Sequence, residues 1–131
     1  DVFVAGRKFE YLKERMLGYE ELMKLPVMCL EGNTSTRTYV EQFLASKQVT
    51  IRPEFELATS DMLIQFAVRN LGIASVVRNF AEEHLTEGDL FELRFLEEIP
   101  ARTFCIVANE RIPLSAAAAT LMNVLVQGTS Q

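Results

Sequence analysis

The spacing of apolar residues along the chain alternates between two patterns. Short apolar runs such as "VFVA" and "VMCL" are separated by longer segments in which apolar residues recur every three or four positions. The first pattern indicates buried strands and the second indicates amphipathic helices. Strands are expected at residues 2–5, 27–30, 54–57, 73–77, 90–95 and 103–108.

Helices are expected between these strands, at residues 8–16, 19–24, 36–46, 61–70, 80–85 and 115–126. In the segment 36–46, for example, Tyr39, Val40, Phe43 and Leu44 fall on one helical face. Because strands and helices alternate, the sequence predicts an α/β fold with a largely parallel sheet.

Polar loops follow three of the expected strands in succession: "EGNTSTR", "ATSD" and "RN". In an open parallel sheet, the loops that leave the carboxyl ends of the strands face one crevice. The helix that follows each loop needs a capping side chain, and the sequence offers Thr34 or Ser35, then Ser60, then Asn79.

These loops hold more polar groups than capping requires. The candidate ligand-binding residues are Asn33, Thr34, Ser35, Thr36, Arg37, Thr59, Ser60, Asp61 and Arg78. Helix N-termini carry a partial positive charge, and together with guanidinium groups they suit a small anion such as a carboxylate. The alternative is that Arg37 pairs with a surface glutamate and the hydroxyls only cap.

Composition narrows the class of protein. A chain of 131 residues with 49% hydrophobic content is expected to form one domain, or nearly one. Its net charge is −5 and no stripe of Lys and Arg is present, so the chain as given is not expected to bind DNA or RNA. It shows no apolar run of about 20 residues and no signal-peptide layout at its start, which predicts a cytoplasmic protein without a membrane partner.

Nucleophilic and metal chemistry find little support in the sequence. Cys29 and Cys105 lie in apolar runs, where reduced and buried thiols are expected. The sole histidine, His84, lies in the charged segment "FAEEHLTEG" and is expected at the surface. We therefore expect no metal site, no cofactor and no enzymatic activity, because a nucleophile such as Cys29 or Ser35 has no identifiable base.

Several segments resemble, in order and spacing, one known family. They are "YEELMKLPVMCLEGNTSTRTYVEQFL", "FELATSDMLIQFAVRNLGIASV", "GDLFELRF" and "CIVANERIPLSAAAATLMNVL". Together they resemble the C-terminal effector-binding, or substrate-binding, domain of LysR-type transcriptional regulators. The family commonly has Gly and Pro where this chain has Asn70 and Val77, so the third loop, with Arg78, departs from the pattern.

The resemblance implies a cytoplasmic bacterial regulator with a periplasmic-binding-protein-like type II fold and a small effector between two subdomains. Thr34 to Arg37 match the first effector loop of the family, and Thr59, Ser60 and Asp61 match the second. The coupling between effector and DNA binding in such systems is commonly about 1 to 3 kcal/mol. A solute-binding protein of the periplasmic type, without a role in transcription, is the alternative.

The same resemblance implies that the chain is part of a longer protein. Residues 7–98 would form one complete three-layer subdomain, and residues 1–6 and 99–131 would supply crossover strands and the closing helix of the other. The winged helix-turn-helix head that contacts DNA, and the first part of the first subdomain, would lie outside this chain. The closing helix at 115–126 would then expose an apolar face, which predicts packing on its own subdomain or against a second copy in a homo-oligomer.

Overall fold

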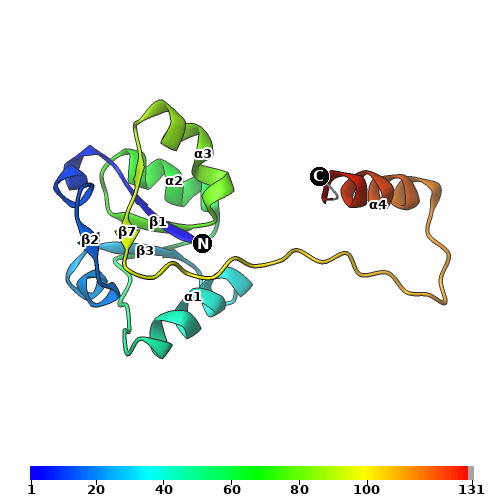
Figure 1. The fold of residues 1–131 in the computed structure, drawn as a ribbon, viewed down its shortest axis with the longest axis horizontal. Helices are drawn as coiled ribbons and strands as arrows, with labels where there is room; N and C mark the ends of the chain where they lie inside the picture. The colour runs from blue at the N-terminus through cyan, green and yellow to red at the C-terminus, as the bar shows by residue number, and fades with distance from the viewer. Residues whose placement is uncertain (130–131) are drawn as a thin grey trace. The chain divides into compact units, whose positions relative to one another are not determined.

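A computed structural model describes residues 1–129, and the chain divides into two compact units. Unit 1 is Asp1–Ala101 and unit 2 is Arg102–Gln131. Figure 1 shows the elements of each unit, which are described separately below.

The sheet of unit 1 has five strands among the described residues, in the order β4-β3-β5-β1-β6. The strands are β1 (Val2–Ala5), β3 (Val27–Leu30), β4 (Phe55–Leu57), β5 (Ile73–Val76) and β6 (Phe91–Glu92). Strand β3 pairs in parallel with β4 and β5, whereas β1 runs antiparallel to both of its neighbours. A smaller parallel pair joins β2 (Met16–Leu17) to β7 (Arg94–Phe95). The predicted alternation and the largely parallel sheet are confirmed, with β1 as the antiparallel exception.

Helices cover both faces of this sheet. Helix α1 (Ser35–Ser46) lies on one face, and α2 (Ser60–Val68) and α3 (Arg78–Glu87) lie on the other (Figure 1). Residues 7–12 and 19–24 form the short 3₁₀ helices η1 (Arg7–Leu12) and η2 (Tyr19–Lys24). The amphipathic spacing explains the layers, because each helix buries its apolar stripe against the sheet.

Two buried clusters hold the three layers together. Val40 and Leu44 of α1 pack in one cluster, and Leu63 and Ile64 of α2 pack in the other. Strand β1 contributes to both, because Phe3 belongs to the first cluster and Val4 to the second. Successive side chains of a strand point to opposite faces, so a strand of four apolar residues suits the centre of a sheet covered on both sides.

Strand β1 is an inner strand of the sheet in unit 1, between β5 and β6. Both of its edges carry ladder bonds, and its apolar side chains fill both cores. Within this chain, residues 1–6 therefore pack together with the rest of unit 1. The predicted division, with residues 7–98 as one complete subdomain and residues 1–6 and 99–131 as parts of another, stays a prediction.

Unit 2 contains one helix within the described residues, α4 (Ala116–Thr129), after an extended segment. The strand predicted at 103–108 is wrong, because no strand among residues 1–129 pairs with it. Phe104 and Val107 in this segment are 86% and 91% exposed. A strand needs a neighbour to satisfy its backbone groups, and this segment has none in the described part of the chain.

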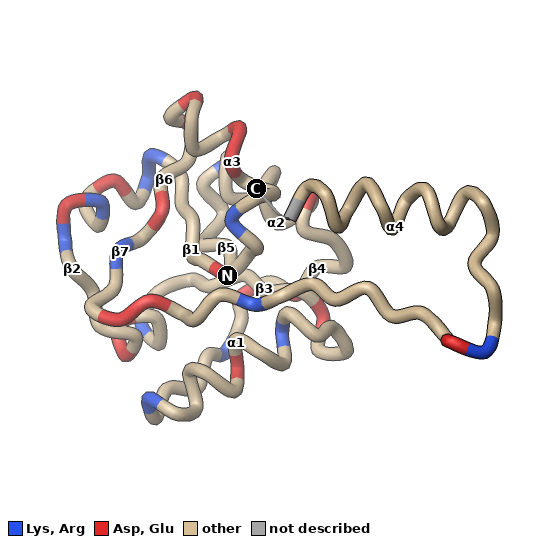
Figure 2. The backbone as a smooth tube through the Cα atoms, turned by 45° about the vertical axis from the view of Figure 1, so that its right-hand side comes forward, with Lys and Arg blue, Asp and Glu red and all other residues tan. Residues whose placement is uncertain are grey.

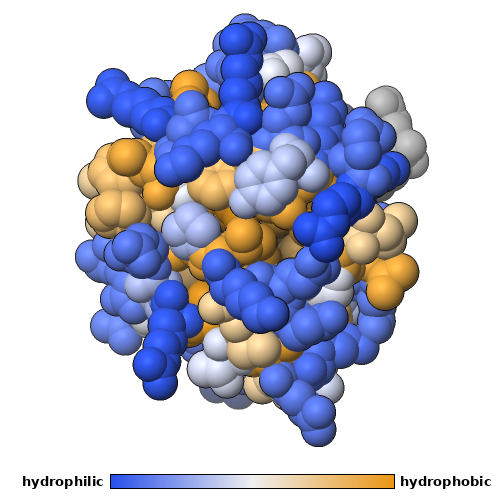
Figure 3. Space-filling model, turned by 90° about the vertical axis from the view of Figure 1, so that its left-hand side faces the viewer, coloured by the Kyte–Doolittle hydropathy of each residue, from blue (hydrophilic) through white to orange (hydrophobic). Residues whose placement is uncertain are grey.

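Charge is distributed unevenly over the two units. Figure 2 shows Lys, Arg, Asp and Glu throughout unit 1, whereas α4 carries no charged residue. On the face of unit 1 that carries β2 and β7, hydrophilic side chains surround a smaller apolar area (Figure 3). Among residues 1–129, no helix has the length and apolar character needed to cross a bilayer.

Candidate functional site

The carboxyl edge of the sheet is the candidate site. Strands β3, β4 and β5 are parallel, so the loops that follow them leave from the same edge. From that edge α1 crosses one face of the sheet, whereas α2 and α3 cross the other (Figure 1). Ligands of open α/β sheets bind where adjacent loops separate to opposite faces, which here is on both sides of β3, toward β4 and toward β5.

The loop before α1 is organised by Thr34. The Thr34 hydroxyl oxygen accepts a hydrogen bond from the Arg37 backbone N–H at 3.1 Å and donates one to the Glu31 carbonyl at 3.1 Å. Thr34 is thus the N-cap, as one of the two predicted candidates. Asn33 and Ser35 are exposed, and Thr36 is half-buried.

The caps of α2 and α3 differ from the prediction. Thr59, not Ser60, caps α2, and its hydroxyl accepts from the Met62 N–H at 3.2 Å. Ser60 is the first residue of the helix and Asp61 lies in its exposed first turn. Helix α3 begins after Val77, with no side-chain cap among the described residues, so Asn79 is not a cap. Because Thr59 and Ser60 are adjacent hydroxyl residues, sequence alone does not set which one has the extended backbone of a cap.

Arg37 is held by groups of its own unit. Its Nε donates to Glu41 at 2.5 Å, and its Nη1 donates to Glu56 at 3.1 Å and to the Leu30 carbonyl at 2.9 Å. The Arg37 side chain is only 12% exposed. Burial by itself lowers the pKa of Arg37, but the hydrogen bonds to Glu41 and Glu56 outweigh it and raise the pKa above its usual value. The structure therefore shows the alternative that the sequence left open, in which Arg37 pairs with glutamates.

Beside Arg37 lies a cavity of about 20 Å³, lined in part by Cys29, Thr36 and Ser75. This volume holds about one water molecule, so it cannot hold a metabolite. Burial raises the pKa of the Cys29 thiol to about 11, although the Arg37 guanidinium opposes this shift. A thiol that stays protonated at neutral pH is a poor nucleophile.

Arg78 borders a much larger hollow in unit 1. Its Nε donates to Glu92 at 3.1 Å, and half of its side chain is exposed. The hollow has a volume of about 430 Å³. Its lining residues are Asp1, Val2, Phe3, Met16, Tyr19, Arg78, Glu92, Leu93, Arg94, Phe95, Glu98, Ile99 and Ala101.

The hollow adjoins the carboxyl edge because β1 is antiparallel to its neighbours. The start of β1 lies beside the end of β5, where Val2 faces Val76 in the register. The sequence did not point to Glu92, Arg94 and Asp1 as candidate site residues. A pattern of polar loops does not show that an antiparallel strand brings its first residue to this edge of the sheet. The order of the strands is the information that was needed.

The carboxyl edge of the sheet can hold a small polar or anionic ligand through backbone N–H groups and hydroxyls, without a guanidinium group that is free of ion pairs. The first N–H groups of an α-helix have no partner within the helix and carry partial positive charge. Helices α1 and α2 present such groups at one edge, next to the hydroxyls of Ser35 and Ser60. Arg37 and Arg78 are paired with carboxylates, so they supply less positive charge than their number suggests.

Comparison with known proteins identifies the family. Residues 2–130 match the LysR substrate binding domain family. The HTH-type transcriptional activator CmpR of Synechocystis sp. (strain ATCC 27184 / PCC 6803 / Kazusa) is 27% identical over 73 residues, which are 56% of this chain and 24% of CmpR.

Two solved structures show the same fold. The regulatory domain of CcmR from Synechocystis PCC6803, in complex with 2-PG, has a TM-score of 0.74 and 17% identity, over 98% of this chain and 62% of that one. HinK, a LysR family transcriptional regulator from Pseudomonas aeruginosa, has a TM-score of 0.66 and 16% identity, over 93% of this chain and 42% of that one.

The chain therefore spans about a quarter of CmpR and less than two thirds of either solved structure. CmpR and HinK are named as transcriptional regulators and not as enzymes. The predicted periplasmic-binding-protein-like type II fold is confirmed by these neighbours and by the α/β layers of unit 1. Since the match covers nearly the whole sequence, the chain belongs to the LysR substrate-binding domain family of transcriptional regulators.

Proposed function

We propose that this domain senses a small anionic metabolite at the carboxyl edge of its sheet and, in the full-length regulator, couples that metabolite to DNA binding. The observation that carries the proposal is the opening of three strand-to-helix loops at one edge, with the separation of faces on either side of β3. Binding would occur in the cytoplasm, between this unit and a second subdomain. DNA would be contacted only through a winged helix-turn-helix head outside this chain.

Related domains support a small ligand on this fold. The CcmR regulatory domain was solved with 2-PG, and a regulatory domain of HypT from Salmonella typhimurium was solved with a bromide ion. For our chain we propose a carboxylate or another small anion, because N–H groups and hydroxyls predominate at the edge.

The proposed contacts divide the predicted residues into two groups. Backbone N–H groups of the first turns of α1 and α2, with the side chains of Asn33, Ser35, Thr36 and Ser60, would contact the ligand. Thr34, Thr59 and Arg37 would position these turns, because their side chains are committed to caps and ion pairs.

Asp61 and Arg78 would have contrasting roles at the carboxyl edge of the sheet. The Asp61 carboxylate opposes an anion, so it would accept a hydrogen bond from a hydroxyl or amine of the ligand. Arg78 would exchange its exposed ion pair with Glu92 for one with the ligand, since an exposed pair of this kind contributes little stability.

A ligand can act as a signal only if it binds two arrangements of the regulator with different free energies. A difference of about 1 to 3 kcal/mol is common for coupled sites. We propose that the two arrangements differ in the angle between this unit and the second subdomain, within a homo-oligomer.

Proline substitutions offer a direct test. Ser35 and Ser60 are the first residues of α1 and α2, where proline is well tolerated, and the residues before them have the extended backbone that proline requires. Ser35→Pro and Ser60→Pro therefore remove one N–H and one hydroxyl each while the helices remain.

The measurement is a thermal-shift screen of the full-length regulator against small carboxylates, phosphate esters and bromide. We expect at least one compound to raise the melting temperature of the parent and to do so much less in Ser35→Pro and Ser60→Pro. Ser46→Ala, at the opposite end of α1, serves as the control and should behave as the parent. Equal stabilisation of all four proteins would place the ligand elsewhere. An effector that binds normally but leaves operator binding unchanged in a mobility-shift assay would favour the solute-binding alternative.

A further inference from the structure

We propose that His84, Glu87 and Asp89 form a binding site for a divalent transition-metal ion such as Zn²⁺. The site lies at the C-terminal end of α3, whereas the proposed effector edge lies at its N-terminal end. One imidazole nitrogen with two carboxylate oxygens is a donor set that Zn²⁺ and similar ions accept. The inference does not depend on the effector proposal.

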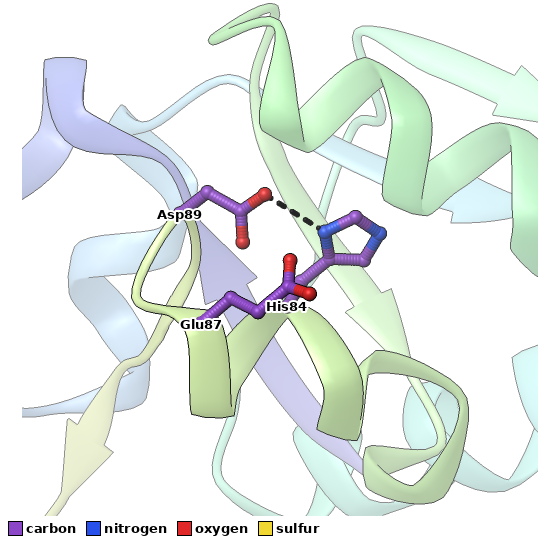
Figure 4. A group of neighbouring side chains, drawn as sticks. All are labelled: His84, Glu87 and Asp89. Atoms are coloured by element: carbon purple, nitrogen blue, oxygen red, sulfur yellow. Dashed lines mark hydrogen bonds and ion pairs between the residues drawn. The ribbon is translucent and has the colours of Figure 1, made fainter.

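The three side chains converge on one space (Figure 4). His84 Nδ1 lies 2.9 Å from Asp89 Oδ2, and one ligand atom from each residue lies within 4.8 Å of the other two. Two ligand atoms on a tetrahedral ion are about 3.4 Å apart, given bonds of about 2.1 Å. A pair of ligand atoms at the 4.8 Å limit would have to close by about 1.4 Å, and the exposed Glu87 side chain can supply this by rotation. His84 Nδ1 and Asp89 Oδ2 would have to move apart by about 0.5 Å and exchange their hydrogen bond for bonds to the ion.

The backbone turn after α3 fixes the other two ligands. Gly88 has the left-handed conformation, with φ of 86°, and its N–H donates to the His84 carbonyl at 3.0 Å. The Leu90 N–H donates to the same carbonyl at 3.3 Å, and the Leu90 side chain is buried. This turn returns the chain so that Asp89 faces His84. Only glycine adopts this conformation readily, so the turn depends on Gly88.

One oxygen of Asp89 supplies a further observation at this cluster. Its Oδ1 atom is buried and has no hydrogen-bond partner among the described residues, although 37% of the side chain as a whole is exposed and Oδ2 is paired with His84. Buried polar atoms are normally satisfied, and an exception needs an explanation such as an ion. A cation bound by Asp89 and Glu87 would satisfy this oxygen and relieve the repulsion between the two carboxylates. The carbonyl groups at the end of a helix also favour positive charge.

Neighbouring charges set limits on the affinity. Glu10 lines a hollow with Asp89, but so do Arg7 and Lys13, whose charges oppose a cation. Three protein ligands leave at least one position for water, so we expect weaker binding than at a closed four-ligand site. Mg²⁺ and Ca²⁺ prefer oxygen ligands alone, and the imidazole therefore favours Zn²⁺, Co²⁺ or Ni²⁺.

Titration with Zn²⁺ alone tests the site by calorimetry. The protein should carry Cys105→Ser throughout, because an exposed thiol can bind Zn²⁺ by itself. We expect Glu87→Gln and Asp89→Asn each to weaken binding by about tenfold or more. Asp89→Asn keeps an oxygen that can accept from His84, so the turn should remain folded. Glu83→Gln removes a neighbouring exposed charge from the same helix and should leave binding nearly unchanged.

Two results would overturn the proposal. One is the absence of Zn²⁺ binding at millimolar concentration in the folded parent. The other is equal weakening by Glu83→Gln and Asp89→Asn, which would indicate general attraction to an acidic helix. Amide hydrogen exchange supplies a separate readout, because a bound ion should slow exchange at residues 88–90 in the parent and not in Asp89→Asn.

Discussion

Units 1 and 2 contain similar proportions of apolar residues but use them differently. In unit 1 the apolar positions of strands and helices meet in two buried clusters on either side of one sheet. In unit 2 no residue from 102 to 128 is buried, and large side chains such as Leu121 and Val124 are exposed. The difference shows that an apolar pattern predicts which face of an element will be buried, but not that the chain contains its partner.

The comparison also separates local from non-local structure. Helix α4 forms because its hydrogen bonds are internal and its first turn is rich in alanine, the strongest helix former. Ser115 supports the start, since its hydroxyl accepts from the Ala118 N–H at 3.1 Å. The segment 103–108 has the composition of a strand but gains no strand neighbour within residues 1–129.

The largest expected effect is on the stability of unit 1, and it is measured by truncating one buried leucine there and one exposed leucine in unit 2. Leu63→Ala should lower the free energy of unfolding by about 2 to 5 kcal/mol, because Leu63 is fully buried and its removal leaves a cavity. Leu121→Ala, at an exposed position, should change it by less than about 0.5 kcal/mol. Urea denaturation followed by circular dichroism measures both. The measurement is made at concentrations where the chain is monomeric, and a comparable loss in the two variants would mean that α4 is buried within its own chain.

Self-association of the chain would sharpen the comparison. We expect the exposed apolar face of α4 to pack against a second copy, so that light scattering shows a dimer or larger species at high concentration. Replacing Leu121 and Leu125 together by glutamate should shift the chain to monomer while the melting temperature of unit 1 stays the same. A parent that remains monomeric at all concentrations would contradict this expectation.

Alkaline pH should destabilise unit 1 through Tyr19. Burial raises the pKa of Tyr19 to about 12, with Glu97 and Glu98 adding to the shift, and the hydroxyl donates to the Glu97 carbonyl. The ordinary pKa is 10.0, so the unfolded chain loses this proton first. Stability from this group is therefore complete below pH 10 and is lost as pH rises toward 12. The loss should be on the order of 2 kcal/mol.

Denaturation of Tyr19→Phe across the same pH range provides the measurement. The variant should be less stable near neutral pH, where it lacks one hydrogen bond, and should lose less stability above pH 10. Cys29 also has a raised pKa, but it titrates in both proteins and cancels in the difference. Tyr11→Phe, at an exposed position, is the control. Parallel pH profiles for parent and Tyr19→Phe would show that Tyr19 ionises as freely in the folded state as in the unfolded state.

A smaller effect than at Leu63 or Tyr19 is expected for Arg37→Ala. This change leaves Glu41, Glu56 and the Leu30 carbonyl without the guanidinium, and we expect a loss of about 1 kcal/mol, because both glutamates are half exposed. We expect ligand affinity to fall only to the extent that the loop before α1 becomes less ordered. A complete loss of binding with unchanged stability would instead make Arg37 a direct ligand contact.

Much of the fold could be predicted from local patterns. Strands 2–5 and 27–30 match the structure, as does the helix in 36–46 apart from its first residue. The segment 90–95 was predicted as one strand, but Leu93 separates β6 from β7, which pair with different partners. Pairing of this kind is non-local, and periodicity does not contain it.

The candidate site was predicted less completely, for a similar reason. A cap bonds to a residue three positions away, so the local sequence indicates roughly where caps lie. Thr34 is one of the two candidates predicted for α1, but Thr59 caps α2 where Ser60 was predicted. The partners of Arg37 include Glu56, nineteen positions along the chain, which no local pattern indicates. The proximity of Arg78, Glu92 and the start of β1 likewise depends on strand order.

The antiparallel direction of β1 brings two distant positions of unit 1 together. Asp1 and Ala101 line the same hollow, although they stand at opposite ends of the sequence of this unit. A molecule lodged in that hollow would contact the last residue of unit 1, and it would therefore hold the backbone that continues into residue 102.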